Sequence, residues 1–165
     1  MHSIKTILHP TDFSAPAVAA FRCACSLASH YGAQLVIVHV TRASVTYGAG
    51  LCFPKAEERQ KNLAEELFDL AVPDEHVDVV RRLEQGKPAA EILHLARLCQ
   101  ADLIVMGTHG RRGLKRFLMG SVADEVIRTA ACPVLTVRAL ASEEEFDLSD
   151  NATTSFALKP TAAEA

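Results

Sequence analysis

Four small residues at a fixed spacing carry the clearest chemical signal in this sequence. Gly107 and Gly110 are followed, after nine further residues, by Gly120 and Ser121. Glycine lets the backbone approach a ligand closely, and the free N–H groups at the start of a helix attract anions. Because a strand-like apolar segment precedes these residues and a helical pattern follows them, we expect a backbone pocket for a phosphate group.

The segment that joins the glycines is basic. It holds Arg111, Arg112, Lys115 and Arg116, and His109 stands between the first two glycines. For each of these side chains, contact with a phosphate and simple solvation both remain open. Their shared effect is a positive field around the predicted pocket.

Two purely structural readings stand beside the binding hypothesis. The stretch from Ser121 to Asp124 resembles a capping box, which starts a helix without any ligand, and the first two glycines can form a simple tight loop. Asp12, which follows the first strand-like run, can hold a sugar hydroxyl, or it can cap a helix or form an Asx-turn. The residue types alone do not separate these roles.

The elements that must position these residues follow from the apolar pattern, which alternates between short and long runs. Strands are predicted at 5–9, 34–40, 77–83, 103–106 and 133–137, and helices at 15–31, 55–71, 88–99 and 121–130. This order indicates an α/β fold with an open five-stranded parallel sheet and helices on both faces. Ligands in such folds bind beyond the carboxyl ends of the strands, where Thr11, Asp12, Val40 and Gly107 stand.

Finer features of these elements can also be predicted. The continuous apolar run 34–40 indicates a strand buried on both faces, whereas the more polar run 77–83 indicates a strand nearer an edge. Ser14 is a predicted N-cap and Gly32 a predicted stop of the first long helix. Pro88 suits the first turn of a later helix.

Composition and charge narrow the partners that we expect. The 165 residues carry a net charge of −3, which argues against general attraction to nucleic acid. No apolar run reaches the roughly 18–20 residues of a membrane span, and the first residues lack the layout of a signal peptide. The five cysteines suit a reducing compartment, as small buried apolar side chains. We therefore expect a cytoplasmic protein with neither nucleic-acid nor membrane partners.

The chain divides into two parts. Residues 1–140 hold all the predicted elements and form one predicted domain, whereas residues 141–165 contain one lysine and six acidic residues. We expect the second part to be a flexible acidic tail. His9 and His39 lie near strand ends, but no histidine shows the spacing of a metal site, and no nucleophile stands beside a base. Neither a metal site nor catalytic residues are predicted.

These motifs together resemble the universal stress protein family. The resemblance rests on the segments 9–14, 39–40, 106–110, 120–122 and 132–137, and it extends over about residues 3 to 138. ATP-binding members of that family carry the pattern Gly-x2-Gly-x9-Gly-Ser/Thr, which is complete in this sequence.

The resemblance implies a Rossmann-like sheet of order 3-2-1-4-5, similar to that of adenine nucleotide α-hydrolases, and a homodimer formed partly through the last strand, 133–137. It implies that ATP binds with Mg²⁺. Asp12 would hold the ribose, while Thr11 and the backbone of Val40 would meet adenine or ribose. The phosphates would lie against Gly107, Gly110, Gly120, Ser121 and Val122, and the predicted site is completed by Pro10, Met106, His109 and Arg112.

The resulting functional hypothesis is an ATP-binding regulator of the stress response with little or slow ATP hydrolysis. Two alternatives stay open. One is a dimeric interaction protein that binds no nucleotide, and the other is a slow ATPase or nucleotidyl-transferring enzyme.

Overall fold

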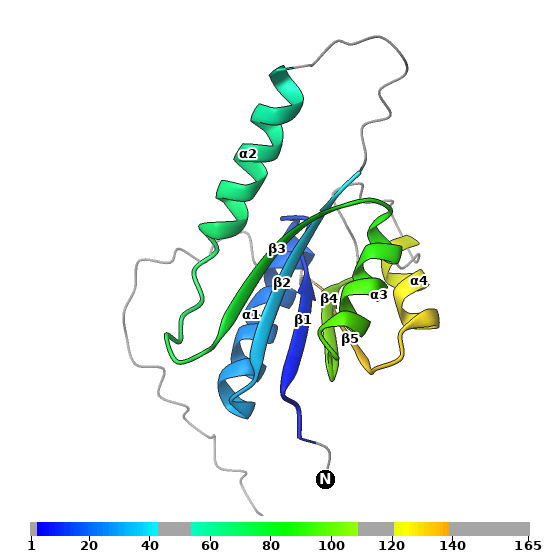
Figure 1. Cartoon of the computed structure of the whole chain (residues 1–165). Helices are drawn as coiled ribbons and strands as arrows, with labels where there is room; N and C mark the ends of the chain where they lie inside the picture. The colour runs from blue at the N-terminus through cyan, green and yellow to red at the C-terminus, as the bar shows by residue number, and fades with distance from the viewer. Residues whose placement is uncertain (1–2, 43–53, 109–120, 139–165) are drawn as a thin grey trace, which may run out of the picture.

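The computed structural model describes residues 3–42, 54–108 and 121–138. A five-stranded parallel sheet of order β3-β2-β1-β4-β5 forms its centre (Figure 1). Its strands are β1 (Thr6–Pro10), β2 (Gln34–Thr41), β3 (Val79–Gln85), β4 (Leu103–Gly107) and β5 (Val134–Val137). The helices are α1 (Ala15–Tyr31), α2 (Pro54–Phe68), α3 (Pro88–Leu98) and α4 (Ser121–Thr129). The predicted fold class and strand order are confirmed.

The helices cover both faces of the sheet because alternate residues of each buried strand point to opposite sides. Helices α3 and α4 lie together on one face, and α1 lies on the other (Figure 1). Leu8 of β1 stands beside Val36 of β2 and Ile104 of β4 in the strand register. All three side chains therefore pack into the same layer, beneath α3 and α4.

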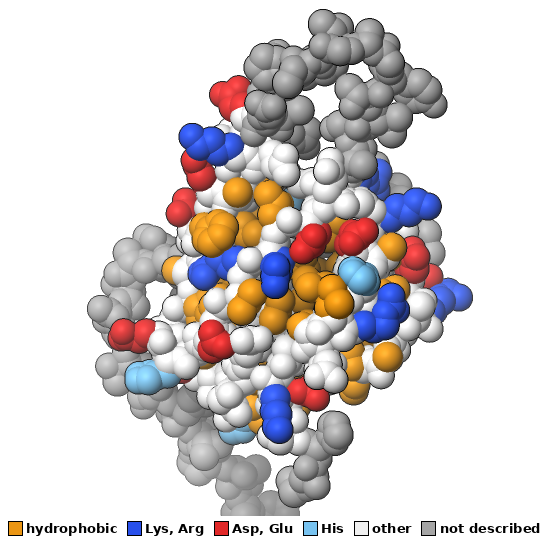
Figure 2. All heavy atoms as spheres, in the orientation of Figure 1, with side chains coloured by type: hydrophobic (Ala, Val, Ile, Leu, Met, Phe, Trp, Pro, Cys, Tyr) orange, Lys and Arg blue, Asp and Glu red, His pale blue; other side chains and the backbone are white. Residues whose placement is uncertain are grey.

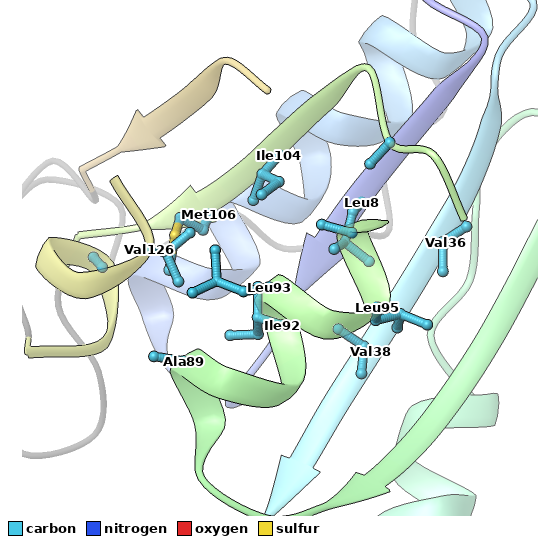
Figure 3. Packing of buried hydrophobic residues seen from close by; sticks show 13 residues of the cluster. Leu8, Val36, Val38, Ala89, Ile92, Leu93, Leu95, Ile104, Met106 and Val126 are labelled. Carbon is cyan, nitrogen blue, oxygen red and sulfur yellow. The ribbon is translucent and has the colours of Figure 1, made fainter. Parts of the chain in front are cut away.

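Figure 3 shows this layer, in which side chains of three strands meet the inner faces of α3 and α4. Each fully buried aliphatic side chain contributes about 1.5–3 kcal/mol relative to exposure. The labelled members are Leu8, Val36, Val38, Ala89, Ile92, Leu93, Leu95, Ile104, Met106 and Val126. A second layer packs α1 against the other face, through residues such as Ile7, Phe21 and Val105.

The predicted helix boundaries are confirmed where local chemistry decides them. The Ser14 hydroxyl accepts a hydrogen bond from the N–H of Ala17 at the start of α1. Gly32 ends α1 with φ at 61°, in the left-handed region that favours glycine. Pro88 stands in the first turn of α3, where its missing N–H has no partner to lose.

Burial confirms the predicted character of two strands. The residues from Leu35 to Val38 in β2 are all buried. In contrast, β3 is an edge strand, and none of its residues is buried. The prediction of β3 at 77–83 was two residues too early, because the N–H of Val77 closes a turn onto the Asp74 carbonyl. The ladder continues to Gln85 instead.

Two further predictions need correction. Helix α2 ends at Phe68, not at residue 71, and its Leu67 is buried while Phe68 is 64% exposed. The cysteines were predicted to be buried, but among the described ones only Cys25 is; Cys23, Cys99 and Cys132 are half-buried. They lie at positions where the helices and the turn before β5 meet solvent.

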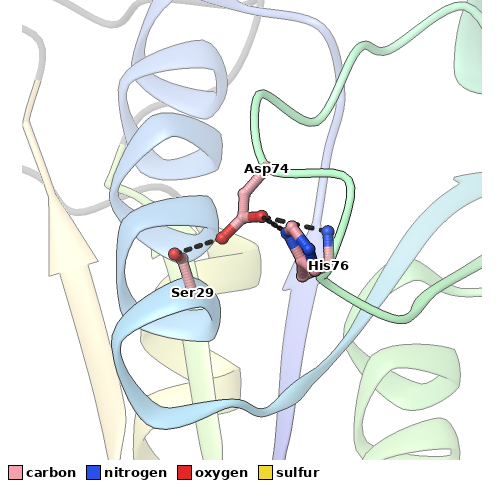
Figure 4. Close-up of polar contacts among 3 residues, drawn as sticks. All are labelled: Ser29, Asp74 and His76. Atoms are coloured by element: carbon pink, nitrogen blue, oxygen red, sulfur yellow. Dashed lines mark hydrogen bonds and ion pairs between the residues drawn. The ribbon is translucent and has the colours of Figure 1, made fainter.

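A polar contact joins the end of α1 to the loop before β3 (Figure 4). The Asp74 carboxylate accepts the Ser29 hydroxyl at 2.5 Å and the backbone N–H of His76 at 3.0 Å. The Oδ1 atom of this carboxylate also lies 3.1 Å from the Nδ1 atom of the His76 ring. These hydrogen bonds, with that of Ser29 first in size, hold the pKa of Asp74 below its usual range.

The surface of the α3 and α4 face carries a mixture of side chains. Figure 2 shows hydrophobic side chains gathered near its middle, with charged side chains of both signs around them. No helix among the described segments is long and apolar enough to span a membrane.

Candidate functional site

The candidate site lies at the carboxyl ends of β1, β2 and β4. The chain runs from β1 outward to β2 and β3 on one side, and β4 and β5 lie on the other side of β1. The strand order therefore reverses between β1 and β4, which is where sheets of this kind bind ligands. Pro10 ends β1 and Gly107 ends β4, so two predicted site residues flank this point.

Thr11 is fixed at the end of β1 by backbone and side-chain bonds. Its N–H donates to the Val38 carbonyl of β2 at 2.8 Å, and its hydroxyl oxygen accepts the N–H of Phe13 at 3.1 Å. Thr11 is only 7% exposed. Its side chain thus stabilises the turn between β1 and α1, a role that the sequence did not indicate.

Asp12 forms the Asx-turn that was one of its predicted roles. Its Oδ1 atom accepts the backbone N–H of Ser14 at 3.1 Å and the Ser14 hydroxyl at 2.5 Å. The same Ser14 oxygen caps α1 through Ala17. The carboxylate therefore stands, half-buried, beside the first turn of α1 and the ends of the strands. Its contact with a ribose stays a prediction.

His39 of β2 reaches the same turn from the neighbouring strand. Its Nδ1 atom lies 2.8 Å from the carbonyl oxygen of Thr11, and its ring lies 4.8 Å from the Phe13 ring, centre to centre. Because a carbonyl oxygen only accepts, Nδ1 must carry the hydrogen of this bond. Phe13 has φ at 61°, an uncommon conformation for a residue with a side chain.

Gly107 has a packing reason to be glycine. A Cβ atom at this position would stand 2.7 Å from the carbonyl carbon of Pro16 and 2.9 Å from the nitrogen of Ala17. The end of β4 therefore lies directly against the first turn of α1. This close approach explains Gly107 without a ligand, and contact with a phosphate stays a prediction.

Three predicted site residues share the apolar layer under α3 and α4. Met106 is 5% exposed and belongs to that buried cluster, and Val40 and Val122 are half-buried against it. The ends of β2 and β4 and the start of α4 therefore belong to one apolar cluster. Thr11 and Asp12 stand at the β1 end of the same edge.

Helix α4 begins at Ser121, where the sequence predicts it, and Ser121 is exposed. The Asp124 carboxylate contacts the Arg128 guanidinium one turn later, with oxygen-to-nitrogen distances of 3.0 and 3.1 Å. The capping-box role of Ser121 and Asp124 stays a prediction, because the residues just before Ser121 lie outside the described ones.

Four of the predicted site residues lie outside the described residues, together with the neighbouring basic side chains. They are His109, Gly110, Arg112 and Gly120. The predicted acidic tail, 141–165, lies outside them too. The predictions made for these positions rest on the sequence.

His9 is buried directly beneath the site. Its Nδ1 atom lies 2.8 Å from the Val105 carbonyl oxygen, its ring packs 5.6 Å from that of Phe21, and it is 0% exposed. Burial lowers the pKa of His9 to about 4, although the Val105 carbonyl and the charge of Asp12 act in the opposite direction. Its Nε2 atom has no hydrogen-bond partner among the residues that the structure describes. Within the described ranges, no three His, Cys, Asp or Glu side chains are grouped to hold a metal ion.

Sequence reasoning missed three residues at this edge. Phe13 adopts the left-handed turn. His39 was considered as a metal ligand and as part of the family resemblance, but not as a contact of this turn. Thr108 is 5% exposed with its N–H bonded to the Val137 carbonyl. A signal for His39 existed in its spacing. His39 stands two residues after Ile37, and Ile37 packs on the α1 side of the sheet and pairs with His9. Because alternate residues of a strand point to the same face, His39 points to the α1 side as well.

Comparisons with known proteins agree with this arrangement. Residues 3–138 match the model of the Universal stress protein family. A universal stress protein of Methanocaldococcus jannaschii is 35% identical over 147 residues, which cover 81% of this chain and 82% of that protein. A protein of Staphylococcus epidermidis described as a putative universal stress protein is 37% identical over 151 residues, which cover 88% of this chain and 91% of that protein.

A solved structure of a universal stress protein in complex with cAMP is similar in fold and sequence. It has a TM-score of 0.65 and is 25% identical, and the match covers 84% of this chain and 100% of that one. The structural similarity therefore includes a protein that holds an adenine nucleotide.

Proposed function

This chain belongs to the universal stress protein family, and on that premise we propose that it binds ATP at the carboxyl ends of β1, β2 and β4. Nucleotide occupancy would then regulate a partner or a conformation in the stress response. ATP hydrolysis would be slow or negligible, far below the median enzyme turnover of about 10 s⁻¹.

The observation that carries this proposal is that the predicted site residues within the described ranges lie together at the carboxyl ends of the strands. Asp12 supplies a carboxylate beside the switch point. Half-buried Val40 and Val122 supply apolar side chains from two separate elements, which suit the face of an adenine ring. The helix start at Ser121 supplies backbone N–H groups of the kind that attract phosphate.

The relative solved with cAMP supports the nucleotide class. The choice of a triphosphate rests on the sequence pattern of glycines and on the basic residues between them. Charge-assisted hydrogen bonds to phosphate are about twice as strong as neutral ones, so a basic segment would favour ATP over adenosine.

Mg²⁺ would accompany the triphosphate. Asp12 is the only acidic residue in the predicted site, and Mg²⁺ is usually held by one or two carboxylates together with phosphate oxygens and water. One carboxylate from the protein therefore fits a Mg²⁺ ion that is held mainly by the nucleotide. The ion would neutralise part of the phosphate charge.

We also propose a homodimer through β5. This strand is at an edge of the sheet, and its Leu135 is 38% exposed. An edge strand offers backbone groups to a second chain, and an exposed leucine adds apolar area to such a contact.

Isothermal titration calorimetry with ATP and Mg²⁺ tests the binding proposal, with ADP, cAMP and GTP as competitors. Asp12→Asn is the informative variant, because an amide oxygen still accepts the N–H of Ser14 while the negative charge is lost. We expect ATP to bind and the variant to bind about tenfold or more weakly, since hydrogen bonds to a charged group contribute about 1.5–3 kcal/mol.

Asp78→Asn is the matched control. Asp78 immediately precedes β3, at the amino ends of the strands and thus at the opposite end of the sheet from the candidate site, and its carboxylate accepts a hydrogen bond from the Gln34 side chain. Equal ATP affinity in the parent and Asp78→Asn is expected. No heat with millimolar adenine nucleotides, or equal affinity in Asp12→Asn and the parent, would overturn the assignment.

A further inference from the structure

An imidazole ring on the neighbouring strand β2 contacts the turn between β1 and α1. Thr11, Asp12 and Phe13 make up this turn, in which the Thr11 hydroxyl and the Asp12 carboxylate accept N–H groups from residues just ahead in the chain, while the Thr11 N–H donates to β2. His39 adds a side-chain contact from β2, because its Nδ1 atom lies 2.8 Å from the Thr11 carbonyl oxygen.

The conformation of the turn needs such support. Phe13 lies at φ 61°, and a left-handed conformation costs a residue with a side chain roughly 1–2 kcal/mol. The His39 ring packs on the Phe13 ring at 4.8 Å with a tilt of 37°, a separation typical of attractive ring pairs. One ring therefore contacts both the carbonyl that begins the turn and the side chain of its strained residue.

The position of Asp12 follows from that conformation. Asp12 stands between the carbonyl that His39 binds and the residue that His39 packs against. A change in either contact rotates the backbone on one side of the Asp12 Cα atom, and its carboxylate moves with it.

From this geometry we propose that His39 is a positioning residue for the nucleotide. This inference rests on the proposed function. The ring, with a hydrogen on Nδ1, holds the turn so that the Asp12 carboxylate is directed at the bound sugar. The side chain of His39 itself acts through Thr11 and Phe13, and its neighbour Val40 lies on the opposite, α3-facing side of the sheet.

Two variants separate this role from simple packing. His39→Leu keeps an apolar side chain of moderate size but has no donor for the Thr11 carbonyl. His39→Asn keeps an N–H donor near the position of Nδ1. His94→Leu is the control for removing a histidine, because His94 is exposed on α3.

Two readouts are required. Calorimetry with MgATP measures affinity, and amide hydrogen exchange of Phe13 and Ser14 measures how firmly the turn is held without any nucleotide. We expect His39→Leu to weaken MgATP binding about five- to tenfold, in line with one lost hydrogen bond, and to speed exchange at both amides. His39→Asn should restore much of both properties, and His94→Leu should leave them unchanged.

The outcomes keep this inference and the proposed function apart. If the parent binds no adenine nucleotide, the proposed function fails and the positioning role fails with it, whatever the exchange rates show. If the parent binds MgATP but His39→Leu binds it equally well, the function stands and the positioning role is overturned. Failure of His39→Asn to restore affinity while the protein remains folded would also overturn it, because the donor would then not be the essential feature.

Discussion

Gly107 at the end of β4 lies against Pro16 in the first turn of α1, so closely that a Cβ atom on Gly107 would stand 2.8 Å from the Pro16 carbonyl oxygen. The first helix and the fourth strand therefore meet backbone to backbone beside the candidate site.

Gly107→Ala tests this contact. Because the obstructing atoms belong to the backbone, we expect the free energy of unfolding to fall by about 1–3 kcal/mol, as for other overpacked sites. Gly32→Ala is the control, since a Cβ atom there would meet nothing within 4 Å. It should cost only the left-handed strain of roughly 1–2 kcal/mol. Urea denaturation measures both losses, and a loss for Gly107→Ala well below about 1 kcal/mol would contradict the close approach.

His9 predicts a loss of stability in mild acid. Its pKa is about 4 in the folded chain and 6.5 as the ordinary value, so the unfolded chain binds the extra proton between these values. The stabilisation is complete above pH 6.5 and is lost progressively as the pH falls toward 4, by about 3 kcal/mol in all.

The measurement is urea denaturation at a series of pH values in the parent and in His9→Gln. The variant cannot gain the proton, so its stability should fall less steeply between pH 6.5 and 4. Parallel profiles for the two proteins would show that His9 is not the buried neutral group.

The lowered pKa of Asp74 predicts a second, weaker loss of stability at lower pH. Its folded pKa lies below the ordinary value of 3.8, so its stabilisation is present above that value and is lost as the pH falls through the lower, folded one. Asp74→Ala should leave the melting temperature almost unchanged but speed amide exchange at His76, whose N–H it releases. Unchanged exchange at His76 would show that the carboxylate does not order this loop.

Leu135 tests the proposed dimer. Leu135→Arg should place a charge on the exposed side of β5 and weaken self-association at least tenfold, measured by sedimentation velocity over a range of concentrations. Phe68→Arg is the matched control, because Phe68 is 64% exposed at the end of α2, which contacts β3 at the other edge of the sheet from β5. Equal dissociation of both variants, or of neither, would count against a dimer through this strand.

Local sequence chemistry predicted the parts of the fold that local chemistry decides. The cap at Ser14 and the stop at Gly32 depend on residues within one helical turn, so they could be located in advance. The boundaries of β3 could not, because they depend on which residues of β2 lie opposite. The register pairs Thr41 with Gln85, and neither residue type indicates that pairing.

The candidate site divides in the same way. The sequence alone determined the order of strands and helices, and hence that Asp12 and Gly107 stand at the same edge of a parallel sheet, because apolar periodicity and chain order are properties of the chain itself. Only the tertiary structure decided that the backbone of Gly107 packs against the first turn of α1 with no room for a side chain, and that His39 binds the Thr11 carbonyl. Those contacts join residues far apart in the chain, and their geometry is set by strand register and helix packing, which no short stretch of sequence encodes.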